Sequence, residues 1–454
     1  MIINDTELNA LMNESIRPKC TPLIDVTMFT GENGESIYRA WNENTVLNLT
    51  YKRGVDPVGR TLPYMELVWS EPNTEQAFES ETMSRPEDFG TLSRVTFTFT
   101  QYMDFGGENK KTVFMYPLWL VGTPVVNGNE VVWTARDMMY FLNNKQEIGF
   151  QKGLNFRNPL RYFLLDERAE HKSNPYDDSF IDAIQVTQDR IKDDTEPIIN
   201  TIVVYDGKTK NLLKDIASTR NYFWDFDRYG IVLRHISELL NKTDIVHTFR
   251  GDTMKKYPDL TQNSNISAFS FARHRAKIKT NEEYTLIEPS AVEENLGVSV
   301  NRYDLEDWGT ITGNDNAVFV PNTINKVIYV PTTTKNLTIA PVSITSEELF
   351  VNNNKVGELY SENNTCFYKE GNSKMAPRME LLNQYFNEDI YTMQFECLPH
   401  FAIEPCDLVG IETNLFENGE RVIKQGVVIE QELSYNGAWT EKLIVHEVNA
   451  NGTI

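Results

Sequence analysis

The sequence has few of the residues that usually build catalytic or metal centres. Among its 454 residues there are 4 cysteines, and no two are spaced as CxxC: Cys20, Cys366, Cys397 and Cys406. The 6 histidines form no HExxH zinc motif, because His446 precedes Glu447 but no second histidine follows four residues on. A GxSxG nucleophile motif, a P-loop and a GxGxxG motif are also absent. The residues therefore nominate no catalytic, cofactor-binding or metal-binding site.

Long apolar segments are absent too. The longest apolar run, 114–126, is interrupted by Pro117, Gly122 and Pro124. It is also shorter than the roughly 20 residues that a membrane-spanning helix needs. The N-terminus is acidic and polar where a signal peptide has a basic start and an apolar core. We therefore expect no membrane span, and synthesis in a reducing cytosol where cysteines stay free or buried.

Positive charge is scarce. The sequence has 43 Lys and Arg against 65 Asp and Glu, which gives a formal net charge of -22. A field of that sign repels phosphates and argues against stable binding of nucleic acid. Solubility alone accounts for such a charge. The apolar content of 40% is that of a folded protein, and the length predicts about two to four domains.

What the sequence has in abundance is strand patterning. Residues 94–102 alternate apolar side chains with threonines, which predicts a half-buried antiparallel strand. Asn-Gly pairs in 127–129, 417–420 and 435–438 predict tight hairpin turns, because both central positions of such turns take a positive φ. Imperfect alternation in 426–435 predicts a β-bulge. Short helices are expected in four segments: 136–144, 158–171, 177–191 and 376–386.

The pattern is best ordered in 201–235. A strand precedes a helix that has Thr209 as its N-cap and Leu213, Ile216 and Ala217 on one apolar face. The stretch YFWDFDRYGIVLRH, residues 222–235, then predicts a hairpin. We expect Gly230 at its tip to take a positive φ. We also expect Phe223 and Ile231 to pack inward.

The aspartates of this hairpin also match the start of an EF-hand calcium loop. Asp225 and Asp227 take the first two ligand positions and Gly230 the turn position. Tyr229 then stands where an oxygen ligand is needed, and Ile236 stands where the loop needs a bidentate glutamate. A hairpin turn is therefore favoured over a calcium site.

Other candidate chemistry has a structural alternative that is at least as good. Acidic pairs such as Asp177/Asp178 arise readily by chance among 65 acidic residues, and nothing singles out the two carboxylates of a glycosidase. The basic segment 271–279 could bind an anion, but it alternates as a strand with one solvated face does. Cys406 and His400 could form a catalytic pair, although a buried cysteine at the start of a strand is the commoner case.

Two segments carry a series of further motifs in a fixed order. The matching positions in the first are Trp119, Val121, Pro124, Thr134, Asp137, Met138, Leu213, Ile216, Ala217, Asp225, Asp227 and Gly230. Those in the second are Asp407, Val409, Thr413, Gly419 and the turn 435–438. Together they resemble the baseplate hub and tail-tip family of bacteriophages and related injection machines, over about half of the chain. That family usually has glycine where Cys406 stands.

The resemblance implies a mainly β protein with α/β insertions, an α+β fold. Hub proteins are similar to two small antiparallel β-barrels of tail-tube type, joined by α/β elements. It implies an N-terminal β-barrel domain at 1–146 and a helical and β-α-β-β connecting domain at 147–255. An irregular β-rich region at 256–395 would contribute to the second barrel and an insertion, and 396–454 would supply the C-terminal barrel strands.

The implied function is that of a structural virion protein without enzymatic activity. Such a hub links the tail tube to the distal tip and forms part of the channel for DNA ejection. Expected partners are further copies in a homotrimer with a pseudo-sixfold ring, tail-tube or distal-tail proteins, and tip, fibre or spike proteins. DNA would pass without being bound, and no membrane span is expected. The protein would be made in the host cytoplasm and reside in the virion.

Two alternatives remain open. One is a β-rich cell-wall glycan hydrolase, which would depend on Asp225 or Asp227. The other is a carbohydrate-binding tail protein, whose 7 tryptophans and 20 tyrosines would stack on sugars. The second segment that resembles the hub family ends shortly before residue 454, so the peptidase or lysozyme-like domain that many tail-tip relatives carry is not expected here.

Overall fold

The structure is a computed structural model, which describes the chain in segments between Cys20 and Val448. The described residues are 20–29, 36–73, 86–90, 93–102, 110–114, 117–141, 145–149, 204–208, 213–214, 217–218, 221–227, 230–278, 285–286, 289–295, 298–304, 309–312, 318–319, 327–333, 338–363 and 372–448. The helices expected at 158–171 and 177–191 lie outside these residues, as does the pair Asp177/Asp178.

The N-terminal half of the large sheet contains nine antiparallel strands. They are β1 (Cys20–Phe29), β2 (Ser36–Asn42), β3 (Asn48–Gly54), β4 (Tyr64–Pro72), β5 (Arg94–Tyr102), β6 (Lys110–Phe114), β7 (Leu118–Leu120), β8 (Val125–Asn127) and β9 (Glu130–Arg136). Two short helical elements accompany them, η2 (Pro86–Asp88) and α2 (Met138–Phe141). Burial alternates residue by residue along β9 and through most of β4, so one face of the sheet lines a core.

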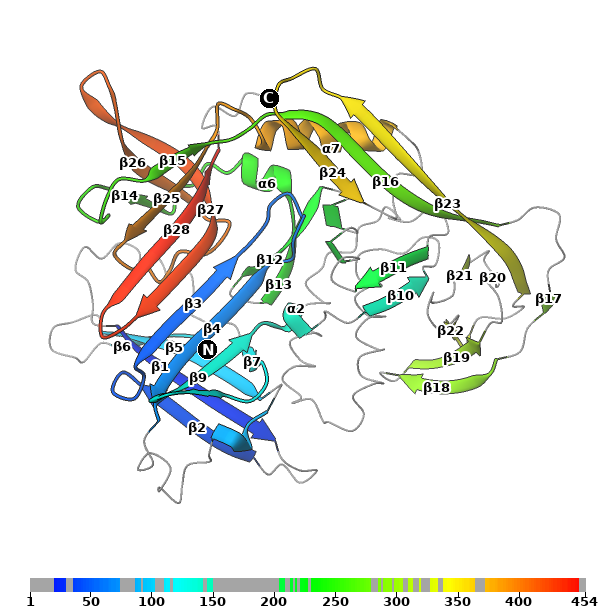
Figure 1. Cartoon of the computed structure of the whole chain (residues 1–454), viewed down its shortest axis with the longest axis horizontal. Helices are drawn as coiled ribbons and strands as arrows, with labels where there is room; N and C mark the ends of the chain where they lie inside the picture. The colour runs from blue at the N-terminus through cyan, green and yellow to red at the C-terminus, as the bar shows by residue number, and fades with distance from the viewer. Residues whose placement is uncertain are drawn as a thin grey trace.

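The C-terminal half contributes six strands to the same sheet. They are β14 (His247–Phe249), β15 (Asp259–Gln262), β25 (Tyr391–Cys397), β26 (Leu408–Glu417), β27 (Glu420–Tyr435) and β28 (Trp439–Glu447). The long strand β27 pairs with β28 and also, in antiparallel register, with β3. The path therefore runs β15-β25-β28-β27-β3-β4-β9-β7-β5-β1-β2 without a break. Figure 1 shows β27 and β28 in red beside the blue β3 and β4.

Smaller sheets are built from the chain between β9 and β25. One contains β16 (Ile266–Ile278), β17 (Thr285–Leu286), β20 (Gly309–Thr312), β21 (Val318–Phe319), β23 (Thr338–Asn352) and β24 (Glu358–Asn363). The others are β18 (Ala291–Asn295) with β19 (Val298–Asp304) and β22 (Val327–Pro331), β10 (Lys145–Gly149) with β11 (Val204–Lys208), and β12 (Tyr222–Asp227) with β13 (Gly230–His235). Helices α6 (Ile236–Leu240) and α7 (Asn372–Tyr385) complete the described elements. In Figure 1, β16 and β23 run together away from the large sheet, and α7 lies beside β24.

The N-terminal core is built around three tryptophans. The ring of Trp41 lies 4.7 Å from that of Trp133 and 5.3 Å from that of Trp69. Glu71 is buried among them and accepts hydrogen bonds from the indole N–H groups of Trp41 at 2.8 Å and Trp133 at 3.0 Å. The guanidinium of Arg39 donates to the same carboxylate at 2.6 Å and balances its charge. A buried polar network with its partners present favours a single arrangement of the core.

Two further cores lie elsewhere in the described part of the chain. The C-terminal core packs Phe249 against Phe395, with ring centroids 5.1 Å apart, and includes Leu443 and Val445 of β28. The third core lies between α7 and the face of β16 and β24 that carries Phe269 and Tyr360, among others. Apolar burial of this kind supplies most of the stabilising free energy of a fold.

Most local expectations from the sequence are confirmed. The strand β5 spans the expected 94–102, and α2 and α7 occur where short helices were expected. The Asn-Gly turns contain Gly128, Gly419 and Gly437 at φ 61°, 86° and 90°. The register of β27 with β28 shifts between Val428 and Glu430, which is the expected bulge.

The mainly β character of the chain is confirmed, whereas the two barrels stay a prediction. Among the described residues, the path of the large sheet ends at β2 on one side and at β15 on the other. The domain boundaries at 146, 255 and 395 also stay predictions.

Candidate functional site

The hairpin β12–β13 lies between the two halves of the large sheet. Side chains along β12 point alternately to its two faces. Trp224 and Phe226 pack in the N-terminal core, whereas Phe223 packs in a small cluster with Cys406. We call this the joint cluster; its buried residues are Val55, Phe223, Leu239, Cys406, Leu408, Val427 and Val448. Because both faces of β12 are covered, its residues from 223 to 226 are all buried.

Asp225 is the polar residue on the face of β12 that meets the joint cluster. Its carboxylate is buried, accepts a 2.6 Å hydrogen bond from Nε of Arg234, and accepts another from the thiol of Cys406. Burial raises the pKa of Asp225, and the charge of Arg234 opposes that rise. The carboxylate is thus used inside the protein, where it connects β12, β13 and the start of β26.

Cys406 occupies a backbone conformation that favours glycine. Its φ is 72°, in the left-handed region where a Cβ is strained. The family that the sequence resembles usually has glycine at this position, and Cys406 takes a φ that glycine readily adopts. Burial, and next the charge of Asp225, raise the pKa of this thiol well above its usual value. A thiol with a raised pKa is a hydrogen-bond donor and a poor nucleophile.

A second set of buried contacts crosses from β3 to β27 and β28. Nε of Arg53 donates to Oε1 of Gln431 at 2.6 Å, and Nε2 of Gln431 donates to Oε1 of Glu441 at 2.5 Å. Arg53 also donates to the carbonyl of Ile403, and the backbone N–H of His400 donates to Glu441 at 2.6 Å. Burial raises the pKa of Glu441 to about 7. The network fixes the register in which the two halves pair.

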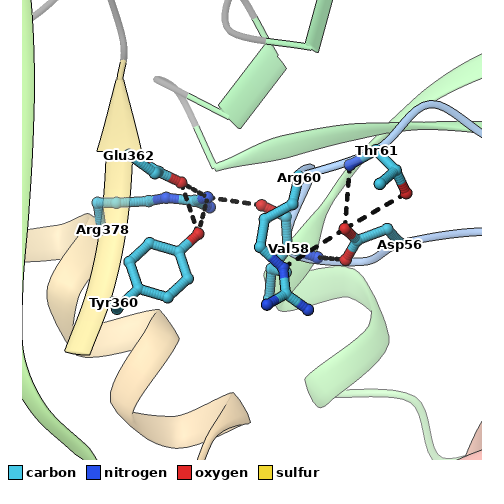
Figure 2. Close-up of polar contacts among 7 residues, drawn as sticks. All are labelled: Asp56, Val58, Arg60, Thr61, Tyr360, Glu362 and Arg378. Atoms are coloured by element: carbon cyan, nitrogen blue, oxygen red, sulfur yellow. Dashed lines mark hydrogen bonds and ion pairs between the residues drawn. The ribbon is translucent and has the colours of Figure 1, made fainter. Parts of the chain in front are cut away.

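The loop between β3 and β4 reaches into the third core. Val58, near the middle of this loop, is fully buried there. Its carbonyl accepts a 2.5 Å hydrogen bond from the guanidinium of Arg378 on α7 (Figure 2). The same guanidinium pairs with Glu362 at 2.5 Å and lies 3.3 Å from the hydroxyl of Tyr360, so one arginine connects three elements.

The shape of that loop depends on Asp56 and Gly59. The carboxylate of Asp56 accepts backbone hydrogen bonds from Val58 at 3.2 Å and Thr61 at 3.0 Å (Figure 2). Gly59 has φ 75°, and a Cβ there would lie 3.1 Å from the carbonyl oxygen of Tyr222. The loop therefore packs closely on the residue that begins the hairpin β12–β13.

Asp137 stabilises the junction between β9 and α2. It accepts backbone hydrogen bonds from Met139 at 2.7 Å, Tyr140 at 3.3 Å and, across to β4, Met65 at 2.6 Å. Burial raises its pKa to about 6 in spite of these bonds.

Three of the features described above lie where the large sheet meets the third core: the hairpin β12–β13, the Arg53 network and the 55–61 loop. Together they form a contact region that we call the joint.

The candidate residues of the hairpin β12–β13 have structural roles. Phe223 and Ile231 are both fully buried, as expected. Gly230 is the first residue of β13 and pairs with Asp227, while residues 228–229 of the tip lie outside the described residues. The carboxylate of Asp225 is buried at the joint cluster and bonded to Arg234, so it is used within the protein.

The other candidate residues from the sequence analysis also have structural roles. Cys406 contacts Asp225, whereas the ring of His400 packs on His247 with centroids 4.3 Å apart. The basic segment lies in β16 through Ile278, where Arg273 is opposite Glu347 of β23. The fully buried tryptophans belong to cores: Trp41, Trp69, Trp119, Trp133 and Trp224.

Three residues of the joint were not singled out by sequence reasoning. Arg53, Gln431 and Arg378 are polar residues in strands or a helix, and such residues usually face solvent. The local signal near them was the interrupted alternation of β27, the strand that contains Gln431. Within the described ranges, no group of three or more His, Cys, Asp or Glu side chains could hold a metal ion. No helix found there has the length and apolar character to cross a membrane.

Comparison with known proteins finds similarity among solved structures alone. No family model matches the sequence, and no curated protein matches it. A 43 kDa tail protein of prophage MuSo2 from Shewanella oneidensis is 10% identical, with 95% of this chain and 99% of that chain covered and a TM-score of 0.45. A tail protein from Neisseria meningitidis is 8% identical, with 94% and 96% covered and a TM-score of 0.44. A prophage tail protein from Listeria monocytogenes is 9% identical, with 94% and 95% covered and a TM-score of 0.40.

Proposed function

We propose that the chain is a structural hub protein of a phage tail tip or baseplate, without enzymatic activity. The proposal rests on the positions and contacts of the motif residues through which the sequence resembles the hub family. Leu213 and Ala217 are fully buried in the N-terminal core, and Asp137 and Asp225 bond to other parts of the same chain. A catalytic motif presents its groups to a substrate. These residues are instead used to hold the molecule together, as a scaffold requires.

The proposed assembly is a homotrimer in which the two halves of each chain give a pseudo-sixfold ring. The continuous sheet that joins the two halves through β27 and β3 supports this proposal. The described sheet path also ends in strands with one free edge, β2 and β15. Unpaired edges and the surfaces beside them are covered by neighbours in many assemblies.

The proposed ring would sit in the virion between the tail tube and the distal tip. Its partners would be tail-tube or distal-tail proteins on one side and tip, fibre or spike proteins on the other. The central channel would let DNA pass during ejection without binding it. The net charge of -22 supports this, because an acidic surface repels the phosphate backbone.

The assembly is tested on the purified full-length chain by mass measurement and particle images. We expect a trimer, or a ring that forms with tail-tube protein. A chain that stays monomeric at all concentrations and binds no tail-tube or distal-tail protein would overturn the proposal.

The absence of enzymatic activity is tested on a panel of wall polymers, with Asp225→Asn as the matched variant. We expect no turnover of peptidoglycan or teichoic acid by either protein, since Asp225 is buried against Arg234. Turnover by the wild-type chain that is lost in Asp225→Asn, while assembly persists, would favour a hydrolase instead.

A further inference from the structure

Three Asn-Gly pairs lie in the described part of the chain, each at the turn of a hairpin. They are Asn127–Gly128 between β8 and β9, Asn418–Gly419 between β26 and β27, and Asn436–Gly437 between β27 and β28. Asparagine before glycine is chemically labile, because the next backbone nitrogen can attack the side-chain amide and glycine has no side chain to hinder it. All three turns are exposed. Asn33 and Asn451 also precede glycine but lie outside the described residues.

The turn at Asn127 is held by a neighbouring strand. Asn73 follows β4, and its backbone N–H donates to the carbonyl of Asn129 at 2.7 Å. The side-chain amide of Asn73 donates to the carbonyl of Gly128 at 3.2 Å. Opening this turn therefore requires the loss of contacts with a third strand as well as with its own hairpin, which raises the free energy of the open state.

The turn at Asn436 is held in a similar way. Tyr435, the residue before it, pairs with Leu49 of β3 as well as with Trp439 of β28. The rings of Tyr435 and Trp439 lie 5.0 Å apart, and the ring of Trp439 packs on that of Phe401 at 5.3 Å. This turn thus closes a hairpin whose last residues belong to the body of the large sheet.

The turn at Asn418 has no third strand beside it within the described residues. Strand β14 pairs with β26 only at 409–411, and β27 pairs with β28 and β3 only from Gly426 onward. Residues 412–425 therefore form a ribbon of two strands, whose end projects at the upper left of Figure 1. Two strands alone are marginally stable in water, so this ribbon opens more readily than a hairpin inside the sheet.

Charge weakens the end of this ribbon further. Glu417 and Glu420 lie directly opposite each other on the two sides of the turn, and both are exposed. Like charges at such a pair repel each other. The guanidinium of Arg421 lies 4.1 Å from the ring centre of Tyr257 and holds the ribbon to the body of the molecule. This contact is made on the side of the acidic pair that faces away from the turn.

We propose that Asn418 is a site of spontaneous deamidation in the folded protein. When the ribbon opens at its end, the backbone nitrogen of Gly419 attacks Cγ of Asn418. The side-chain nitrogen leaves as ammonia, which takes up the proton of the glycine N–H, and a five-membered succinimide remains. Water then opens this ring at either carbonyl and gives aspartate or isoaspartate. Water is the only co-reactant, and no group is oxidised or reduced.

The modified turn differs from the original one in charge and in shape. Asn418 has φ 51° and Gly419 has φ 86°, which suit a tight two-residue turn. Aspartate at this position adds a third carboxylate beside Glu417 and Glu420. Isoaspartate adds a carbon atom to the backbone, so the turn no longer fits the register of the two strands. The reaction changes the exposed end of the hairpin and does not depend on the proposed function.

The three sites are compared in one sample of the purified full-length chain at neutral pH. Mass spectrometry of peptides taken at intervals measures deamidation at each asparagine, and a parallel sample in denaturant gives the rate of each site in the unfolded chain. We expect folding to slow Asn127 and Asn436 by at least about tenfold and Asn418 by less than about fivefold. Equal protection of all three sites, or faster reaction at Asn127 or Asn436 than at Asn418, would overturn the proposal.

The variant Glu420→Lys tests the part played by the acidic pair. Lysine opposite Glu417 replaces repulsion with attraction and keeps the turn closed. Relative to the unfolded rate of the same variant, deamidation of Asn418 should be about two- to fivefold slower than in the wild type. Glu358→Lys makes the same change of charge at an exposed residue of β24 and should leave the rate at Asn418 unchanged. No slowing in Glu420→Lys, or equal slowing in both variants, would contradict opening of the turn as the step that controls the reaction.

Discussion

Arg53 and Gln431 are 378 residues apart in the sequence, and a buried 2.6 Å hydrogen bond joins their side chains. The bond crosses the line where β3 of the N-terminal half pairs with β27 of the C-terminal half. The side-chain amide of Gln431 in turn donates a hydrogen bond to the carboxylate of Glu441 on β28, at 2.5 Å. The two halves are therefore held by side chains as well as by the backbone ladder.

Removal of the arginine should cost much of the stability of the molecule. In Arg53→Met, the acceptors on Gln431 and Ile403 lose their donor inside the protein. We expect the free energy of unfolding to fall by about 2–4 kcal/mol, because buried polar groups without partners are costly. Denaturant unfolding, followed by tryptophan fluorescence, measures the change.

The matched control for Arg53 is its neighbour Lys52. Lys52 pairs with Glu432 at 2.9 Å on the more exposed face of the same strands. Because a partly exposed ion pair contributes little, Lys52→Met should change the free energy of unfolding by less than about 1 kcal/mol. Equal effects of the two substitutions would contradict the role given to the buried network.

Substitutions at Cys406 separate backbone strain from the thiol contact. Cys406→Ala and Cys406→Gly both lose the bond to Asp225, but only glycine relaxes a φ of 72°. We expect the glycine variant to be about 1 kcal/mol more stable to unfolding than the alanine variant. If alanine proves equal to or better than glycine in denaturant titration, the strain at this turn is not significant.

Gly59 should tolerate no side chain. Gly59→Ala would place a Cβ 3.1 Å from the carbonyl oxygen of Tyr222, at a φ of 75°. The backbone strain and the close contact together predict a loss of about 2–3 kcal/mol in the free energy of unfolding. Gly122 has a similar φ, 78°, but open space around its Cβ position. Gly122→Ala should therefore lose only about 1 kcal/mol, the cost of the strain alone.

His446 should make the protein less stable as the pH falls. Its ring stacks on Tyr385 with centroids 3.7 Å apart, and burial lowers its pKa from 6.5 to about 4. The unfolded state binds the proton first, so stability is lost as the pH falls from 6.5 towards 4. By linkage, the loss amounts to about 2–3 kcal/mol.

The variant His446→Phe isolates this contribution, because phenylalanine keeps the stacked ring and does not titrate. The free energy of unfolding is measured for both proteins at pH 7 and pH 4. Other groups titrate alike in both, so the difference between the proteins should move in favour of the variant at the lower pH. A difference that does not change with pH would show that His446 has the same pKa in the folded and the unfolded protein.

The sequence was sufficient where one face of an element is buried and the other is solvated. Strand β5 could be located from its alternation of apolar residues and threonines, although the structure also buries Thr98 on the threonine face. The hairpin β12–β13 is harder, because two different cores cover it and its apolar pattern loses the period of two. Its turn and its two strands could be predicted, but not the position of Asp225 against Cys406.

The joint could not be predicted because its contacts are distant in sequence. Arg378 and the carbonyl of Val58 are 320 residues apart. No local pattern distinguishes a buried arginine on α7 from one that faces water. The glycine-like position of Cys406 was visible through the family resemblance, and the positive φ confirms the conformation that glycine would take there.

The pairing of β27 with β3 also determines when the fold can be completed. Strand β3 spans Asn48–Gly54, and its partner residues are 430–435. During synthesis, the first half of the large sheet emerges from the ribosome with β3 as an unpaired edge until nearly the whole chain has followed. Long-range pairings of this kind form slowly, and exposed edges invite wrong partners meanwhile. A prematurely terminated chain would therefore lack the partner strand of β3, and we expect it to be removed by aggregation or proteolysis before it could enter an assembly.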